Sequence, residues 1–186
     1  NDTAHGIPIT ETIAGKGTVI HSHDAYAGAI GIVGSTSANA LAAEADLVIA
    51  IGTRLMDFTT GSWTCFRQEA KFISINAARW DATKHQALAV VGDAKEAVDE
   101  LAAALTGWKA DTKWIAKARA EFAAWDKMLD GFQKPTNSPV PTYAQIVGVV
   151  NAKASERDYA ITASGGLPGE MMKNWRVKSA NSFDVE

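Results

Sequence analysis

The chain carries at residues 47–52 the apolar run Leu-Val-Ile-Ala-Ile-Gly, which ends in glycine. Two further runs have a similar form, Lys-Phe-Ile-Ser-Ile-Asn at residues 71–76 and Leu-Ala-Val-Val-Gly-Asp at residues 88–93. Short apolar runs without polar alternation are typical of strands that are buried on both faces of a parallel sheet flanked by helices. The three runs therefore predict an α/β fold with a parallel sheet.

Helical segments are predicted between and after these strands. Residues 35–45 are rich in small side chains, and residues 94–105 place their apolar side chains on one helical face. Residues 7–12 predict an earlier strand. This alternation of strands and helices predicts a single α/β domain over residues 1–107, which Thr-Gly terminates.

The pattern changes in the second part of the chain. Residues 108–141 predict a helical connector, with a Trp- and Ala-rich helix over 113–129 and a rigid Pro-rich linker at 134–141. Residues 142–186 then begin a second α/β unit, with a helix over 143–153 that Thr142 caps, a strand and a further helix. A segment of this length does not bury a sheet by itself, so we expect the chain to be a piece of a longer protein.

Composition narrows the class of protein. The 186 residues are 47% hydrophobic and 21% charged, with a net charge of −3, which is typical of a globular domain. This charge favours neither a nucleic-acid partner nor an acidic membrane surface. No apolar run approaches the roughly 20 residues of a membrane helix. The single cysteine, Cys65, excludes a disulfide within the chain and favours the cytoplasm.

The ends of the predicted strands form a candidate binding edge. In open α/β sheets, ligands bind beyond the carboxyl ends of the strands, which places Gly52-Thr53-Arg54, Asn76-Ala77 and Gly92-Asp93 at one edge. Arg54 either binds a phosphate or carboxylate there or pairs with Asp57. Before the first helix, Gly34 and Ser35 offer either a weaker anion site or an ordinary helix cap.

A glycine-rich turn follows the strand predicted at residues 159–164. The sequence Gly165-Gly166-Leu167-Pro168-Gly169 lies between this strand and a helix expected over Met171–Trp175. Glycines let the backbone approach an anion closely, and a helix amino end supplies free N–H groups. The turn is therefore either a phosphate site or a tight connection without a ligand.

Other candidate groups favour structural roles. His21-Ser22-His23-Asp24 has a spacing that suits a metal, but two histidines without a nearby cysteine do not predict a metal site. Cys65 is expected to be a buried structural thiol, and Trp114 and Trp125 are expected to be packing residues. No catalytic Ser/His/Asp set, carboxylate pair or Walker motif is present, so the residues alone predict a binding module.

The order of several motifs resembles the central domain of thiamine-diphosphate enzymes of the acetolactate-synthase and pyruvate-decarboxylase type. The resemblance covers the whole chain. The motifs that carry it are Gly15-Lys16-Gly17, His23, Gly28-Ala29-Ile30-Gly31, the stretch from Ala40 to Arg54, Ser74-Ile75-Asn76 and Val91-Gly92-Asp93-Ala94.

This resemblance implies a six-stranded parallel, Rossmann-like sheet sandwiched by helices. Some relatives hold FAD or another ADP-containing ligand at the strand ends, and others hold none. The positions that match their dinucleotide contacts are Gly34, Ser35, Thr53, Arg54, Asn76 and Asp93. Because Asn76 stands where FAD-binding relatives usually have an acidic residue, FAD is not expected.

The resemblance also implies thiamine diphosphate and Mg²⁺ as cofactors of the full-length enzyme. The expected contacts to the diphosphate are Ser164, Gly165, Gly166, Leu167, Pro168, Gly169 and Glu170. The family's magnesium motif and its cofactor-activating glutamate are not among the 186 residues. We therefore expect no catalytic or metal-binding residue in this chain and no activity from it alone.

Two stretches, residues 57–63 and 163–170, narrow the resemblance to one branch of the family. That branch hydrolyses a carbon–carbon bond to open a cyclic 1,2-diketone in myo-inositol catabolism, as a homodimer or homotetramer. The alternatives are an acetolactate-synthase-like lyase or carboligase and a freestanding nucleotide-binding α/β module. Residues 142–186 argue against the freestanding module, because they suit the start of another domain.

Overall fold

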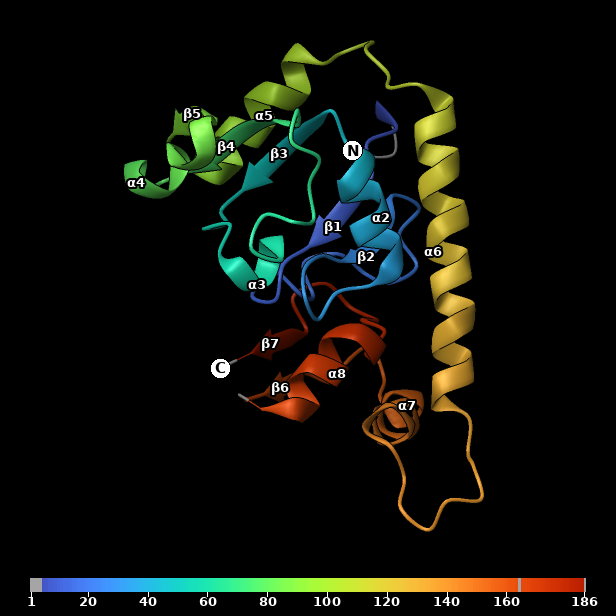
Figure 1. Ribbon diagram of the computed structural model, residues 1–186. Helices are drawn as coiled ribbons and strands as arrows, with labels where there is room; N and C mark the ends of the chain where they lie inside the picture. The colour runs from blue at the N-terminus through green and yellow to red at the C-terminus, as the bar shows by residue number, and fades with distance from the viewer. Residues whose placement is uncertain (1–4, 164, 186) are drawn as a thin grey trace.

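The computed structural model describes residues 5–163 and 165–185 (Figure 1). All of its strands pair in parallel, in three small sheets. The first pair is β1 (Ile9–Glu11) and β2 (Tyr26–Ala29), the central sheet is β3 (Leu47–Ile51), β4 (Lys71–Asn76) and β5 (Leu88–Val91), and the last pair is β6 (Ala160–Thr162) and β7 (Phe183–Val185).

The helices lie between and after these strands. Most are short, and one long helix, α6, runs along one side of the molecule in Figure 1. Their bounds are α2 (Thr36–Glu44), α3 (Asp57–Thr60), α4 (Arg79–Ala82), the 3₁₀ helix η1 (Lys84–Gln86), α5 (Ala94–Ala104), α6 (Thr112–Gln133), α7 (Tyr143–Lys153) and α8 (Gly166–Asn174).

The central sheet confirms the predicted parallel order of the three apolar runs. Leu47 pairs with Lys71 and Ile73 pairs with Leu88, and the register continues without a shift to the carboxyl ends of the strands. A regular parallel register brings equivalent ends of neighbouring strands to the same edge. The residues that follow β3, β4 and β5 therefore lie side by side.

Two expectations about the sheet are wrong for the described residues. The resemblance implied six strands in one sheet, whereas residues 5–107 form five strands divided between a pair and a three-stranded sheet. The apolar runs also implied burial on both faces, yet Ile51 is 48% exposed and Leu88 is 66% exposed. The physical reason is partial cover: β3 and β5 are the two edge strands of this sheet, and α5 packs against β4.

The link from β2 to α2 is a tight structure built around Ser35. The Ser35 hydroxyl accepts a hydrogen bond from the backbone N–H of Ala38 at 3.1 Å, which makes it the N-cap of α2. The same hydroxyl donates to the carbonyl of Ala29 at 3.1 Å. Gly28 approaches this group closely with a φ of +99°, a left-handed value that favours glycine.

The long helix α6 packs against both parts of the chain. Ala118 on α6 forms a buried cluster with Ala27 of β2 and Leu41 of α2, and small side chains allow the three elements to approach closely. Further along α6, Trp125 and Leu129 are buried, and the helix contacts α7. The segment expected to be a connector thus lies against the first strand pair and the C-terminal part.

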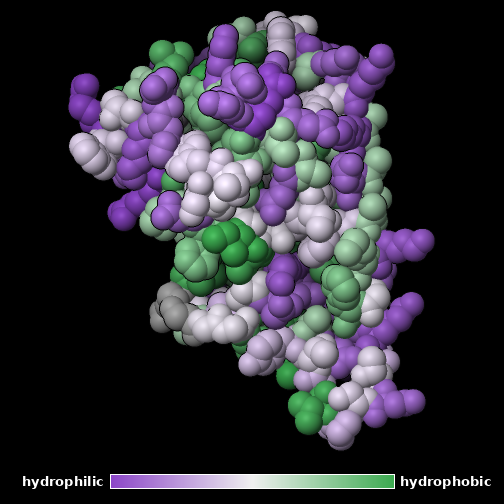
Figure 2. All heavy atoms as spheres, viewed as in Figure 1, coloured by the Kyte–Doolittle hydropathy of each residue, from purple (hydrophilic) through white to green (hydrophobic). Residues whose placement is uncertain are grey.

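The C-terminal part has its own small core. α7 begins with a capping box, in which Thr142 and Gln145 bond each other's backbone N–H groups, as expected for a helix that starts after Thr142. Behind it, a buried cluster is formed by Val147, Trp175, Val177 and Phe183. Figure 2 shows green apolar surface at the junction between this part and the rest of the molecule.

The Gly28 position should not tolerate a side chain. A Cβ there would lie 2.9 Å from the Cβ of Ser35, closer still to its hydroxyl, and at a left-handed φ. We expect Gly28→Ala to lower the free energy of unfolding by about 2 kcal/mol or more. Urea unfolding followed by circular dichroism measures this change.

Gly131 provides the matched control. It lies inside α6, and a Cβ at this position has no atom within 4 Å. Gly131→Ala should therefore raise the free energy of unfolding by roughly 0.5–1 kcal/mol, because alanine is the better helix former. Equal effects of the two substitutions would contradict the tight packing described at Gly28.

Candidate functional site

The carboxyl ends of β3, β4 and β5 form one edge, as the sequence predicted. The N–H of Gly52 donates to the carbonyl of Ile75 at 2.9 Å, and the N–H of Gly92 donates to the carbonyl of Asn76 at 3.3 Å. Gly52, Asn76 and Gly92 therefore adjoin. This places Thr53, Arg54, Asn76 and Asp93 at a common edge of the central sheet.

Three of these side chains are engaged in holding the loops of the edge. The Asn76 amide donates to the carbonyl of Thr53 at 3.1 Å and accepts from the N–H of Ala78 at 2.9 Å. The Thr53 hydroxyl accepts from the N–H of Leu55 at 3.2 Å. Asp93 is the N-cap of α5 and accepts two backbone hydrogen bonds. Their polar atoms thus stabilise local structure.

Arg54 lies exposed at this edge. Its side chain is 72% exposed, and its Nε lies 3.7 Å from the carboxylate of Asp81. The sequence offered Asp57 as a possible ion-pair partner of Arg54, but the carboxylate beside Arg54 is that of Asp81. Because β3 and β4 are parallel neighbours, the loops after them lie side by side, which brings Asp81 of α4 toward Arg54.

Gly34 and Ser35 belong to a different sheet. They follow β2, which pairs with β1, and Ser35 is fully buried as the N-cap of α2. A Cβ at Gly34 would lie 2.5 Å from the carbonyl oxygen of Ala29, so glycine is required for packing here. Of the six positions matched to dinucleotide contacts, the structure brings four together at the central sheet and places these two beside β2.

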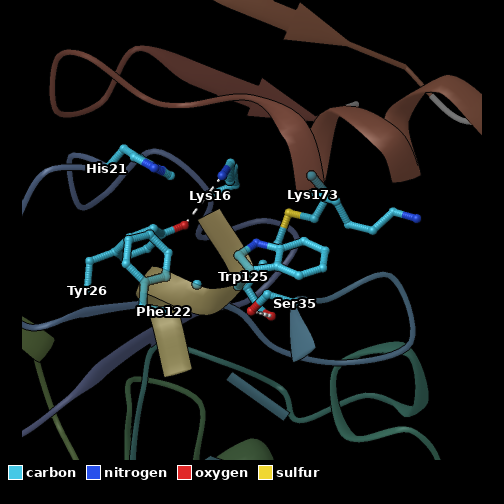
Figure 3. A pocket seen from close by; sticks show the side chains of 10 residues that line it. Lys16, His21, Tyr26, Ser35, Phe122, Trp125 and Lys173 are labelled. Carbon is cyan, nitrogen blue, oxygen red and sulfur yellow. Dashed lines mark hydrogen bonds between the residues drawn. The ribbon is translucent and has the colours of Figure 1, made fainter. Parts of the chain in front are cut away.

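A buried lysine that the sequence did not single out as functional lies close to Ser35. Lys16 is 5% exposed, and its ammonium donates to the Tyr26 hydroxyl at 3.4 Å. Figure 3 shows both side chains at a cavity of about 10 Å³, near the size of one water molecule. The cavity is lined by Lys16, His21, Tyr26, Gly28, Ala29, Ser35, Phe122, Trp125, Met172 and Lys173.

Burial controls the ionisation of this group. Desolvation lowers the pKa of Lys16 to about 8, although the charge of Glu11 opposes the shift. Desolvation likewise raises the pKa of Glu11, against the attraction of Lys16. One Glu11 oxygen accepts from the N–H groups of Gly17 and Val19, and the other has no hydrogen-bond partner among the described residues. Lys16 and Glu11 are thus two buried groups of opposite charge that influence each other's pKa, and one Glu11 oxygen is unsatisfied.

Next to this pair, an ionic chain joins three distant segments. His21 Nε2 lies 2.8 Å from Asp126 of α6, and Arg176, after α8, donates to the same carboxylate oxygen at 2.9 Å. Arg176 also donates to Asp130 at 2.6 Å. Burial lowers the pKa of His21, and the charge of Asp126 opposes this shift. These ionic contacts fix the loop after β1 against α6 and the C-terminal part.

The glycine-rich stretch after β6 is largely helical. α8 starts at Gly166, earlier than expected from the sequence, because proline is tolerated in the first turn of a helix. Gly165 precedes it with a φ of +133°, and a Cβ there would have no atom within 4 Å. The space beside Gly165 is therefore open, while Gly166 in the first turn of α8 lies near the Tyr143 ring. Ser164, predicted with this group, lies outside the described residues.

Glu170 is held away from the amino end of α8. Its two carboxylate oxygens accept from Lys173 at 2.8 Å and from the Asn174 amide at 2.8 Å. Both partners lie one turn further along the helix. The negative charge of Glu170 is thus directed toward the carboxyl end of α8, which leaves the helix dipole at the amino end unopposed.

The other candidate ligands are placed apart or are occupied. His23 accepts a hydrogen bond from the N–H of Ala25 at 3.2 Å, while His21 pairs with Asp126. Over residues 5–163 and 165–185, no three His, Cys, Asp or Glu side chains are arranged to hold a metal ion. Cys65 is half-buried rather than fully buried, and burial raises the pKa of its thiol. In the same residues, no helix is long and apolar enough to cross a membrane.

Comparison with known protein families decides the membership of this chain. The family model described as "Thiamine pyrophosphate enzyme, central domain" matches residues 3–101, which are more than half of the 186 residues. The chain belongs to the thiamine pyrophosphate enzyme family. The matched residues include β1 to β5, the carboxyl edge of the central sheet, and Glu11 and Lys16.

Curated relatives in the thiamine pyrophosphate enzyme family match the chain beyond its central domain. Two are named 3D-(3,5/4)-trihydroxycyclohexane-1,2-dione hydrolase. The protein from Bacillus cereus (strain AH820) is 34% identical over 210 residues, and this match covers 100% of the chain and 32% of the relative. The protein from Clostridium botulinum (strain Alaska E43 / Type E3) is 32% identical over 205 residues, covering 97% of the chain and 32% of the relative. The chain thus spans about a third of the length of these relatives.

In the sequence, Gly15-Lys16-Gly17 indicates only a resemblance to the thiamine pyrophosphate enzyme family. A lysine between two glycines looks like a surface loop, because its burial depends on α6 and α8, which lie far along the chain. The only sequence feature that could have indicated a buried Lys16 was its closeness to Glu11, at the end of a predicted strand. That signal does not separate a buried pair from an exposed one.

The ionic chain predicts how His21 titrates. Asp126 raises the pKa of His21 against the effect of burial, so Asp126→Asn should lower this pKa further. Because the pKa in the folded state already lies below the unfolded value, protonation of His21 favours unfolding as pH falls. The variant should therefore lose more stability than the parent between pH 7 and pH 5.

An NMR titration of the His21 ring measures the pKa, and urea unfolding at the two pH values measures the stability. Asp130→Asn is the matched control, because Asp130 contacts Arg176 but makes no hydrogen bond with His21. An unchanged or higher pKa of His21 in Asp126→Asn would refute the described contact.

Proposed function

We propose that this chain is part of a thiamine-diphosphate-dependent hydrolase that opens a cyclic 1,2-diketone by cleaving a carbon–carbon bond. The observation that carries this proposal is the match to the trihydroxycyclohexane-dione hydrolases over the full chain. The family of the central domain supports the cofactor. Because the chain spans about a third of these relatives, catalysis is proposed to need the rest of the protein, and the chain alone is proposed to be inactive.

The residues of α8 fit an anionic group such as a diphosphate. Gly165 leaves open space before the helix, and the first turn presents the N–H groups of Gly166 and Leu167. The positive end of the helix dipole lies at this turn, while the carboxylate of Glu170 is held away by Lys173 and Asn174. We propose that residues 164–170 bind the diphosphate of the cofactor.

The bound cofactor would supply a carbon nucleophile and an electron sink for carbon–carbon cleavage. The part of this chain is positional: Gly165 and Gly166 let the backbone approach the diphosphate, and Pro168 fixes the first turn. The ionic chain from His21 to Arg176 attaches the segment after α8 to α6. This attachment would hold the cofactor end of the chain at a fixed position relative to the central domain.

We propose Mg²⁺ as the second cofactor and no FAD. Magnesium is expected with the diphosphate and would need ligands from the rest of the protein. The proposal against FAD is supported by Thr53, Asn76 and Asp93, whose polar side-chain atoms already bond the backbone of the central edge. A flavin would have to compete with these hydrogen bonds or bind through Arg54.

The proposed cellular setting is a cytoplasmic homodimer or homotetramer. One cysteine in 186 residues supports a reducing compartment. Several apolar side chains on α7 and β6 are exposed, which supports their burial against other parts of the full-length protein or a second subunit. These are Tyr143, Ile146, Val149, Val150 and Ile161.

The substrate assignment can be tested with the full-length protein. In the presence of thiamine diphosphate and Mg²⁺, we expect ring opening of the cyclic diketone and no turnover of pyruvate. Mass spectrometry of the products separates the two reactions. Turnover of pyruvate with no cleavage of the diketone would overturn the proposed substrate but leave family membership intact.

The diphosphate site can be tested at Leu167, which is 38% exposed in the first turn of α8. Leu167→Asp would add a negative charge where the diphosphate is proposed to bind, and should weaken thiamine diphosphate by about tenfold or more. Aspartate in a first turn favours the helix, so lost affinity would not reflect a weakened helix.

Leu167→Asn is the matched neutral control, because it has the same shape without the charge. Cofactor titration of the full-length enzyme by calorimetry measures both variants. Equal affinities for the two variants would place the diphosphate elsewhere.

A further inference from the structure

A wide groove lies at the amino ends of β4 and β5. Its lining includes Lys71 and Leu88, the first residues of these two strands. Because the strands are parallel, this is the opposite edge of the sheet from Gly52, Asn76 and Gly92. The groove measures about 680 Å³, within the range of roughly 300–1,000 Å³ that is usual for ligand pockets.

Aromatic rings form the wall of this groove. The rings of Trp63 and Phe72 lie 5.4 Å apart between centroids in an edge-on arrangement, and those of Phe66 and Phe72 lie 5.0 Å apart. His85 lies against Trp63 at 3.4 Å. Phe66 is fixed from behind by the buried cluster that includes Ile30 and so supports the wall.

The backbone beside these rings is held in a conformation that side chains rarely adopt. Ser62 and Trp63 have φ values of 51° and 68°, and His85 and Gln86 have values of 55° and 58°. These two pairs of residues belong to segments that are more than 20 residues apart in the sequence. They meet where the Trp63 ring contacts the His85 ring. Strained backbone of this kind is concentrated at binding sites in proteins, and here it directs both rings to the groove.

The polar side chains at the groove have no internal partners among the described residues. Arg67 and Lys71 are exposed cations, and neither has a carboxylate within 4.0 Å in the part of the chain that the structure describes. The amides of Gln68 and Gln86 likewise make no described side-chain hydrogen bond. The groove thus combines an aromatic wall with two cations and two amides that are available to a ligand.

We propose that this groove binds a small planar aromatic anion. The flat ring packs against the wall formed by Trp63 and Phe72, face to face with one of these rings and edge-on to the other, and its carboxylate or phosphate pairs with Arg67 and Lys71. The amides of Gln68 and Gln86 bond polar atoms on the edge of the ring. This site is separate from the strand edge and the α8 turn, and it does not depend on the proposed reaction.

Three probes separate the two features of the proposed ligand. 2-Naphthoate has the ring and the charge, 2-naphthamide has the ring alone, and cyclohexanecarboxylate has the charge alone. Binding to the protein is followed by two-dimensional NMR through the indole N–H signal of Trp63, which Trp63→Phe assigns. We expect 2-naphthoate to bind at least about tenfold more tightly than either of the others.

Adenosine 5′-monophosphate serves as the phosphate-bearing aromatic anion. Binding of this nucleotide at the Trp63 signal more tightly than 2-naphthoate would identify a phosphate ligand, and the reverse order would identify a carboxylate. Either order supports the site. Failure of both anions to shift the Trp63 signal would overturn it.

Two variants test the residues. Arg67→Gln combined with Lys71→Gln should weaken 2-naphthoate at least about tenfold and leave 2-naphthamide unchanged, because both cations are exposed and do not support the fold. Lys113→Gln, an exposed lysine on α6 that does not line the groove, should change neither. Unchanged binding of 2-naphthoate to the double variant would overturn the proposal.

Discussion

The packing of α6 against the first strand pair is the interaction on which the rest of the structure depends. Ala118 meets Ala27 of β2 and Leu41 of α2, and the two alanine side chains let α6 lie close to β2. About two turns further along the same helix, Trp125 lines the cavity beside Lys16, and Asp126 accepts a hydrogen bond from Arg176 of the C-terminal segment. A larger residue at Ala118 would therefore displace elements that belong to both parts of the chain.

This packing explains why charged groups can remain buried near β1. Residues of α6 and α8 line the cavity beside Lys16, so the desolvation of Lys16 is a consequence of the same contacts that hold the molecule together. A buried pair gains little net stability over an apolar pair of the same shape, but removal of one partner is costly.

The sequence predicted the elements whose signals are local. Residues 71–76 correspond to β4, and the helix after Thr142 has the expected bounds because an apolar face and a capping residue lie within a few positions of each other. β2 was missed, since Tyr-Ala-Gly-Ala becomes a strand only by pairing with β1. The early start of α8 was missed because glycine and proline disfavour helix interiors but are tolerated in a first turn.

The candidate sites also divide into features that local sequence signals predict and features that depend on contacts between distant segments. The common edge of Gly52, Asn76 and Gly92 follows from parallel pairing, which a run of apolar residues indicates. The burial of Lys16 and the contact of Trp63 with His85 depend on segments brought together only by the fold. The partner of Arg54 depends on it too, since Asp81 is 27 residues away in sequence and adjacent in space.

The two edges of the central sheet differ in how their polar side chains are used. At the carboxyl edge, Asn76 and Asp93 bond the backbone, and such satisfied groups form a rigid wall whose further bonds to a ligand must replace existing ones. At the amino edge, Arg67 and Lys71 have no described protein partner, so a ligand there displaces water and breaks no hydrogen bond within the described residues. In the central sheet, the polar side chains of the carboxyl edge thus hold the backbone, while those of the amino edge are available to a ligand. Strand polarity alone would predict the ligand at the carboxyl edge.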